Sequence, residues 1–130
     1  MTEPEDDWPQ EVIPNSDILF MRVHRNFVED GELQPNAFRD QGAGMSTNWQ
    51  KYCVTAEEAR RRATKNPQNN GVVRLGVGPI RNIPLTVEHT PDWALEDRSH
   101  ADVIGQKTAE VRMRLLDIAE WAIKLDDDNV

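Results

Sequence analysis

The nine residues Asp17–Arg25, with the sequence DILFMRVHR, decide the fold that we predict for this 130-residue chain. In an extended strand, successive side chains point to opposite faces. One row consists of Ile18, Phe20, Arg22 and His24. The other row consists of Leu19, Met21 and Val23. Because both rows begin with apolar residues, the pattern predicts a central strand that is covered on both faces.

Further short strands are expected on the C-terminal side of this segment. The dipeptide Asp30-Gly31 between Val28 and Leu33 is typical of a two-residue hairpin turn. We expect additional strands at 45–49, 72–77 and 83–89, and a loop over 90–101.

Two helices are expected. Thr55-Ala-Glu-Glu58 has the pattern of a capping box and predicts a helix over about 56–65, which Asn66-Pro67 ends. A wide apolar stripe at helical spacing predicts a long amphipathic C-terminal helix over about 105–125. The stripe consists of Val111, Leu115, Ile118, Ala122 and Leu125, widened by Leu116 and Ile123. The expected fold is therefore α+β, with a small mixed or antiparallel sheet of about four to five short strands.

The charge of the chain separates its ends from its body. Nine of the 23 acidic residues lie in 1–17 and 126–128, although the net charge of the whole chain is −8. Residues 18–125 hold 14 acidic and 15 basic residues and are close to neutral. We therefore expect an extended, acidic, proline-rich arm over 1–16, a single α+β domain over 17–125 and an acidic tail over 126–130.

Several classes of protein are excluded or disfavoured by composition. Cys53 is the only cysteine, so no internal disulfide forms, and a small packed side chain is the favoured interpretation of this residue. The longest apolar run is only Ile18–Met21, and the acidic start of the chain does not resemble a signal peptide. These features predict a cytoplasmic protein without a membrane association. A metal site is not favoured, no cofactor is expected, and the neutral body does not favour nucleic-acid binding.

Without a strong catalytic motif, the chemistry-bearing candidates are a few polar residues near strand ends. Arg22, His24 and His100 are the candidate catalytic residues of a cleft in which an arginine holds an anion and a histidine transfers a proton. The candidate binding residues of the same cleft are Ser46, Thr47, His89 and Asp102. Each has a structural alternative: Arg22 pairs with Glu88 or Asp102, and each histidine is a satisfied packing residue.

The order of these elements resembles the ADP-ribosyltransferase type of fold, whose members bind NAD. In that family an arginine or histidine, a serine-containing strand and a late glutamate form the site. The resemblance places Arg22 and Ser46-Thr47 in the first two roles. The chain departs from the family in having no complete Ser-Thr-Ser and no Glu-x-Glu, and the nearest acids are Glu57, Glu58 and Glu88.

Two functions are expected from these observations. The first is a small accessory protein, an adaptor or regulatory subunit, that binds another protein or a second copy of itself. Its candidate partner surface consists of Trp8, Leu116, Trp121 and Ile123. The alternative is a small enzyme that binds a phosphate-containing substrate, a nucleotide such as NAD or an RNA, in the cleft with Arg22 and the histidines.

Overall fold

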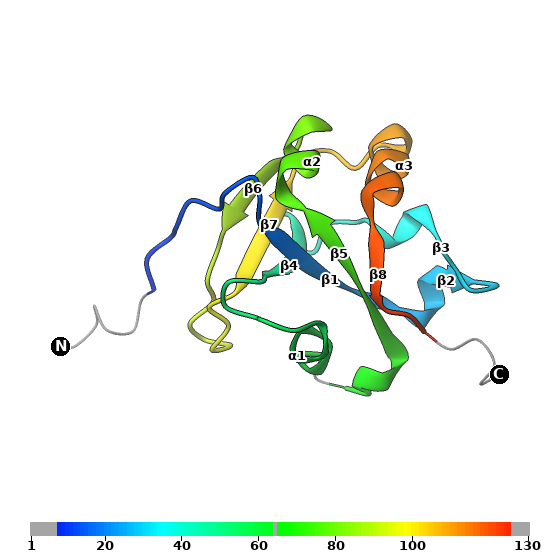
Figure 1. Cartoon of the computed structure of the whole chain (residues 1–130), viewed down its shortest axis with the longest axis horizontal. Helices are drawn as coiled ribbons and strands as arrows, with labels where there is room; N and C mark the ends of the chain where they lie inside the picture. The colour runs from blue at the N-terminus through cyan, green and yellow to red at the C-terminus, as the bar shows by residue number, and fades with distance from the viewer. Residues whose placement is uncertain (1–7, 64, 126–130) are drawn as a thin grey trace.

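The computed structural model describes residues 8–63 and 65–125 (Figure 1). Within these residues a six-stranded antiparallel sheet has the strand order β6-β7-β4-β1-β5-β8. In that order its strands are Thr86–His89, His100–Ile104, Met45–Trp49, Ile18–His24, Asn70–Gly76 and Glu120–Ile123. A separate hairpin joins β2 (Val28–Glu29) to β3 (Glu32–Leu33).

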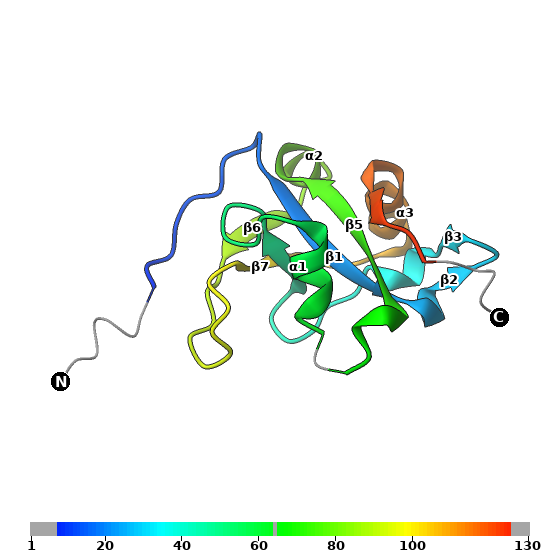
Figure 2. The ribbon, with the colours of Figure 1, turned by 60° about the horizontal axis from the view of Figure 1, so that its bottom comes forward.

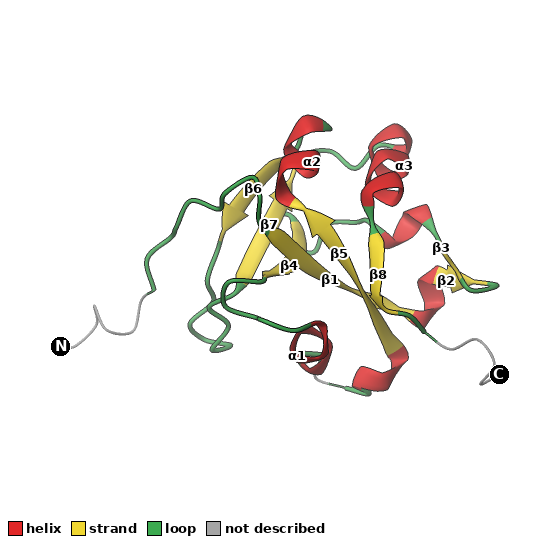
Figure 3. Ribbon diagram, viewed as in Figure 1, coloured by secondary structure: helices red, strands yellow, loops and turns green. Residues whose placement is uncertain are grey.

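The helices are short (Figure 3). The α-helices are α1 (Ala56–Arg61), α2 (Val77–Asn82) and α3 (Ala109–Ile118). Single 3-10 turns are η2 (Arg25–Phe27), η3 (Pro35–Ala37) and η4 (Pro67–Asn69). None of the helices in the described residues is long and apolar enough to span a bilayer.

The expected fold is wrong in its sheet and in its last helix. The sheet has six strands rather than four or five, although its antiparallel pairing is one of the two arrangements that were expected. The long helix over 105–125 does not form. Instead α3 ends at Ile118, Ala119 is extended, and residues 120–123 form the edge strand β8.

Pairing with β5 explains why the apolar stripe at the C-terminus is not one helix. Trp121 lies opposite Val73 and Ile123 opposite Val72, with a bulge between the two β5 residues. Trp121 therefore packs on the main core, whereas Ile123 packs on a second apolar cluster on the other face. Residues two apart share a face in a regular strand, but the bulge shifts the register, so Trp121 and Ile123 reach opposite faces of the sheet. One face of a helix does not do this.

Three smaller expectations also need correction. The helix over 56–65 ends at Arg61, and the strand expected over 83–89 covers only Thr86–His89. The loop expected over 90–101 already contains the start of β7. Between β5 and β6 the chain forms α2, because Pro79 fits the first turn of a helix and α2 buries Val77 and Ile80.

The predictions for the middle of the chain are confirmed. β1 lies in the interior of the sheet, and Val28 pairs with Leu33 around the Asp30-Gly31 turn. Thr55 Oγ1 accepts a hydrogen bond from the Glu58 amide at 3.1 Å, as expected of a helix N-cap.

The sheet is covered on both faces, as Figures 1 and 2 show. α2 and α3 lie over the face that carries Leu19, Met21 and Val23, where the main core forms. α1 lies over the other face, where a smaller cluster contains Phe20, Cys53, Ala59 and Val72. The polar side chains discussed below lie on this second face, beside α1.

The described part of the expected arm, residues 8–16, is extended but packs on the domain. Ile13 is only 1% exposed and belongs to the main core. The Glu11 amide donates to His89 Nδ1, and Arg81 Nη1 donates to the Ile13 carbonyl at 2.7 Å. Trp8 packs edge-on against Trp93, with 4.5 Å between ring centroids. Residues 1–7 and the acidic tail 126–130 lie outside the described residues.

We expect Gly71→Ala to weaken the attachment of β8. A Cβ at Gly71 would lie 2.7 Å from the Ile123 carbonyl oxygen and 2.8 Å from the Trp121 ring. Because a backbone atom is involved, β8 has to shift, so the free energy of unfolding should fall by about 1–3 kcal/mol. Chemical denaturation measures this loss, and amide exchange should show faster exchange over 120–123. Unchanged protection there would contradict the observed packing of β8.

A second prediction concerns acid pH. Lys51 and Tyr52 donate hydrogen bonds to the Glu11 carboxylate, and these bonds hold the pKa of Glu11 below its ordinary value of 4.5. Glu11 therefore stabilises the docked segment fully above pH 4.5, and the stabilisation is lost as the pH falls through its lower folded pKa. The protection factor of the Glu11 amide, which donates to His89 Nδ1, should fall over that acid range. In Glu11→Gln this pH dependence should disappear, and an unaltered profile would contradict the assignment.

Candidate functional site

Polar residues from neighbouring strands share the face of the sheet that α1 partly covers. Strand pairing places Asn48 opposite Phe20, His100 opposite Asn48 and Asp102 opposite Ser46. Because cross-strand partners lie on the same face, these side chains lie on the face of Phe20, Arg22 and His24. The sequence-predicted candidates Arg22, His24, Ser46, His100 and Asp102 are therefore brought to one face.

Arg22 is half-buried and is held by two hydrogen bonds. Its Nη1 donates to Asn48 Oδ1 at 3.1 Å and to the carbonyl of Ala59 at 3.0 Å. The second bond reaches a carbonyl near the C-terminal end of α1, which also accepts from the Arg62 amide and where a positive charge is favourable. Burial lowers the pKa of Arg22, and the nearby Asp97 carboxylate opposes this shift. An arginine remains fully charged under such conditions, so the fold holds a permanent cation here.

Asp97 supplies the counter-charge through a buried network. Asn48 Nδ2 donates to Asp97 Oδ2 at 3.0 Å and to Ser99 Oγ at 2.8 Å. The Ser99 hydroxyl and amide both donate to Asp97 Oδ1, at 2.6 and 3.1 Å. Arg62 lies 3.5 Å from the same oxygen. Asp97 therefore connects the loop before β7 to β4 and α1, and it fixes Asn48 under the Arg22 guanidinium.

A pocket of about 120 Å³ opens above this network, and we call it the Arg22 pocket. Within the described residues, the register between β1 and β4 consists of Leu19 with Trp49 and Phe20 with Asn48. Both strands continue past these pairs, and the pocket lies between their continuations. It is lined by Arg22, His24, Phe27, Ala37, Arg39, Gln41, Ser46, Asn48 and Asn70.

The lining of the Arg22 pocket is electropositive. Arg39 stacks on Phe27, with its guanidinium carbon 4.7 Å from the ring centroid, and adds a second cation. The other polar lining residues are uncharged amides and a hydroxyl, together with His24. None of the described residues that line this pocket is acidic. Such a concave, cationic site without an internal counter-charge is suited to an anion.

His100 lies beside the pocket and contacts Ser46. Its Nε2 is 3.3 Å from Ser46 Oγ, and its Nδ1 is 2.8 Å from Thr90 Oγ1 and 3.1 Å from the Thr90 carbonyl oxygen. Ser46 itself lines the Arg22 pocket. The predicted candidates Arg22, His24 and Ser46 therefore share one cavity, and His100 joins them through Ser46.

The structure places other candidates elsewhere. Thr47 and His89 belong to the opposite face: the Thr47 hydroxyl donates to the Ala101 carbonyl, and His89 packs against Trp49. His89 Nδ1 accepts from the Glu11 amide and its Nε2 donates to the Arg98 carbonyl. Both nitrogens of His89 are hydrogen-bonded to backbone groups. This agrees with the structural alternative, in which the histidine is a satisfied packing residue. Asp102 is buried next to Ser46 but does not line the pocket.

The residues of the predicted partner surface do not form one exposed strip. Leu116 and Trp121 are partly buried against the main core, and Ile123 is partly buried against the smaller cluster. Trp8 lies against Trp93. Their role in binding a partner stays a prediction.

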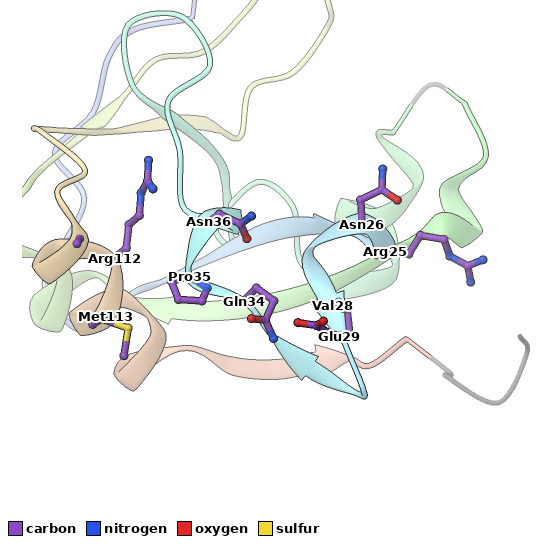
Figure 4. A pocket seen from close by; sticks show the side chains of 10 residues that line it. Arg25, Asn26, Val28, Glu29, Gln34, Pro35, Asn36, Arg112 and Met113 are labelled. Carbon is purple, nitrogen blue, oxygen red and sulfur yellow. The ribbon is translucent and has the colours of Figure 1, made fainter.

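A larger hollow of about 730 Å³ lies between the β2–β3 hairpin, η3 and α3 (Figure 4). Most of its lining residues are exposed, including Arg25, Glu29 and Met113. It brings together two cations, Arg25 and Arg112, and one acid, Glu29, and the buried Arg112 Nε has no hydrogen-bond partner among the described residues. The Glu29 carboxylate would repel an anion, whereas the Arg22 pocket has no acidic lining residue. We therefore place the candidate site in the smaller Arg22 pocket. In the described residues, no three or more His, Cys, Asp or Glu side chains are grouped to hold a metal ion.

Comparisons with protein-family models, with curated proteins and with solved structures found no match to this chain. The resemblance in element order to ADP-ribosyltransferases thus has no support beyond Arg22 and Ser46 themselves. The acids considered for the glutamate role lie apart from the pocket: Glu57 and Glu58 are exposed in the first turn of α1, and Glu88 is exposed on β6.

Several residues of the site were missed by sequence reasoning. Asn48 could have been found, because it shares the row of Ser46 on a predicted strand. Three further lining residues were missed: Arg39, Gln41 and Asn70. The first two lie in the loop before β4 and the third begins β5, and no local sequence pattern indicates that they reach the pocket. Asp97 and Thr90 lie in a segment expected to be a plain loop, so their contacts with Asn48 and His100 had no signal in the sequence.

We expect Asp97→Ala to lower the free energy of unfolding by about 1–3 kcal/mol, because it leaves the Ser99 amide unpaired and removes a carboxylate near two arginines. Chemical denaturation measures the loss. The matched control is Asp117→Ala on the exposed surface of α3, which should change stability by less than about 0.5 kcal/mol. Equal effects of the two variants would refute a structural role for the Asp97 network.

Proposed function

We propose that this chain binds a small anionic ligand in the Arg22 pocket, and that the bound group is a phosphate. The observation that carries the proposal is the state of Arg22. Both hydrogen bonds that this side chain makes with the described residues use Nη1, so Nε and Nη2 stay available for a ligand. The bonds to Asn48 and to α1 fix the guanidinium plane before any ligand arrives, which lowers the entropic cost of binding.

Phosphate fits this site better than a larger group. The pocket volume of about 120 Å³ equals that of about four water molecules, which suits a group of a few heavy atoms. Arginine presents its donors in a planar fork that matches two oxygens of a phosphate. Arg39 offers a second fork at the exposed rim, and the neutral amides of Gln41 and Asn70 offer further donors. This supports the alternative of the sequence analysis, a small enzyme that binds a phosphate-containing substrate in the cleft with Arg22.

A protein-binding role is the second proposal, and a different observation favours it. The loop between β6 and β7 exposes 42% of Trp93 and 71% of Leu95, and Trp8 packs beside them. Exposed apolar side chains of this size are typical of contact surfaces. Purification of tagged protein from its native cell tests this role: a stoichiometric partner should be lost in Leu95→Ser. A monomeric preparation without a partner would contradict it.

The prediction for the Arg22 pocket is specific to charge. Inorganic phosphate and p-nitrophenyl phosphate should bind and raise the midpoint temperature of unfolding. Arg39→Gln should weaken this binding roughly tenfold or more, because one charge-assisted hydrogen bond is lost. Arg39 is exposed at the rim, so its replacement leaves the buried network intact. Isothermal titration calorimetry measures the affinities.

The matched control is Arg61→Gln, an exposed arginine of α1 that pairs with Glu57 and lies outside the pocket. It should bind phosphate as the unmodified chain does. Equal weakening in both variants would indicate a general charge effect and would refute the pocket. Absence of phosphate binding to the unmodified chain would refute the proposed function itself.

A further inference from the structure

We propose that Ser46 is a nucleophile that accepts the phosphoryl group of a phosphate monoester held in the Arg22 pocket, and that His100 is its general base. This inference rests on the proposed function and adds a chemical step to it. Its elements come from three regions of the sheet: Ser46 lies on β4, His100 begins β7, and Thr90 directly follows β6.

The hydrogen bonds of His100 determine its tautomer. Nδ1 lies 3.1 Å from the Thr90 carbonyl oxygen, which only accepts hydrogen bonds. We assign the proton to Nδ1, which then donates to this carbonyl, with Thr90 Oγ1 at 2.8 Å as a second acceptor. Nε2 is then unprotonated and accepts the proton of the Ser46 hydroxyl across 3.3 Å. Ser46, His100 and Thr90 are thus connected in series as nucleophile, base and the group that orients the base, as nucleophilic catalysis requires.

Ser46 differs from the other hydroxyls nearby. The Thr47 hydroxyl donates to the Ala101 carbonyl, and the Ser99 hydroxyl donates to Asp97 at 2.6 Å, so both serve the fold. In the described residues the hydroxyl of Ser46 contacts only His100, while the side chain lines the Arg22 pocket. His89 shows the same contrast with His100, since both of its nitrogens are bonded to backbone.

The pocket places a phosphate within reach of Ser46. Continuing the pairing of Phe20 with Asn48 by two residues puts Ser46 opposite Arg22 across the opening between β1 and β4. A phosphate held by Arg22 and Arg39 therefore has a hydroxyl at its side. The two guanidinium groups also neutralise the charge that the phosphoryl oxygens carry in the transition state.

The step balances without a cofactor. Ser46 Oγ attacks phosphorus as its proton moves to His100 Nε2, the new Oγ–P bond forms, and the P–O bond to the alcohol breaks. With a leaving group such as p-nitrophenolate, the electron pair leaves with the oxygen and needs no proton. Water then attacks phosphorus, and the Oγ–P bond breaks as His100 returns its proton to Ser46 Oγ. Both water protons stay on the inorganic phosphate, so the net reaction converts a monoester and water to p-nitrophenolate, or the alcohol, and phosphate.

The test is the release of p-nitrophenolate from p-nitrophenyl phosphate by the full chain, in the presence of a chelator. Peptide mapping by mass spectrometry should find one phosphoryl group on Ser46. Ser46→Ala and His100→Gln should each slow release at least about 100-fold, the usual contribution of general base catalysis. The matched control is Ser16→Ala, an exposed serine outside the site, which should leave the rate unchanged.

Binding measurements separate the two proposals. Ser46→Ala should still bind phosphate, because Arg22 and Arg39 remain. If the unmodified chain binds phosphate but releases no nitrophenolate and carries no phosphoryl group, the nucleophile is refuted and the proposed function stands. If it does not bind phosphate, the proposed function fails as well. Equal release rates in Ser46→Ala and the unmodified chain would also overturn the nucleophile, because activity would then come from elsewhere.

A second measurement tests the pair without any substrate. Ser46→Cys creates a thiol beside His100, and Cys53, which is fully buried with a pKa raised by that burial, contributes little background. Iodoacetamide should modify Cys at position 46 at neutral pH at least about tenfold faster than in the double variant Ser46→Cys/His100→Gln, because His100 favours the thiolate. Equal rates would show that His100 does not act as a base toward position 46.

Discussion

The burial of the Arg22 guanidinium between β1 and α1 is the constraint on which the site depends. A charged group in this position must be hydrogen-bonded and neutralised, or the fold loses several kcal/mol. Asn48 and the Ala59 carbonyl provide the hydrogen bonds, and Asp97 provides the charge through Asn48. These contacts connect α1, β4 and the loop before β7 around Arg22.

The same network leaves part of the arginine unused. Because the protein bonds of Arg22 involve Nη1, the rest of its fork makes no hydrogen bond with the described residues. Asp97 is held by the Ser99 amide and hydroxyl and by Asn48, so it does not enter the pocket and compete with a ligand. The result is a rigid cation with a distant counter-charge, which is a common way to hold a phosphate. The proposed nucleophile Ser46 lies at the edge of this arrangement.

The two faces of the sheet carry different kinds of side chain. The face under α2 and α3 buries nearly all of the large apolar side chains, and even its histidine, His89, is used to hold the N-terminal segment. The other face has a small apolar cluster only under α1, and its remaining area carries Arg22, His24, Ser46 and His100. Stability is therefore concentrated on one face, which leaves the other available for polar chemistry.

The sequence by itself determined the elements whose signals are local. The alternation in 17–25 predicted a central strand, Asp30-Gly31 predicted the hairpin, and Thr55 with Glu58 predicted the start of α1, because turn, cap and period-two signals act within a few residues. It also identified Arg22, His24, Ser46 and His100 as polar candidates. What it did not determine was which way the segment after Ile118 turns, because the apolar pattern of Trp121 and Ile123 fits a helix as well as a strand.

Only the tertiary structure decided those questions, through contacts between residues far apart in the chain. Val72 and Val73 present opposite faces to residues 120–123 across a bulge, and this made the last segment a strand. Thr90 sets the tautomer of His100, and His100 reaches Ser46 on another strand. Asp97, far along the chain from Arg22, supplies its charge balance. Pairing energies of this kind depend on partners that only the complete fold brings together, so no local pattern reveals them.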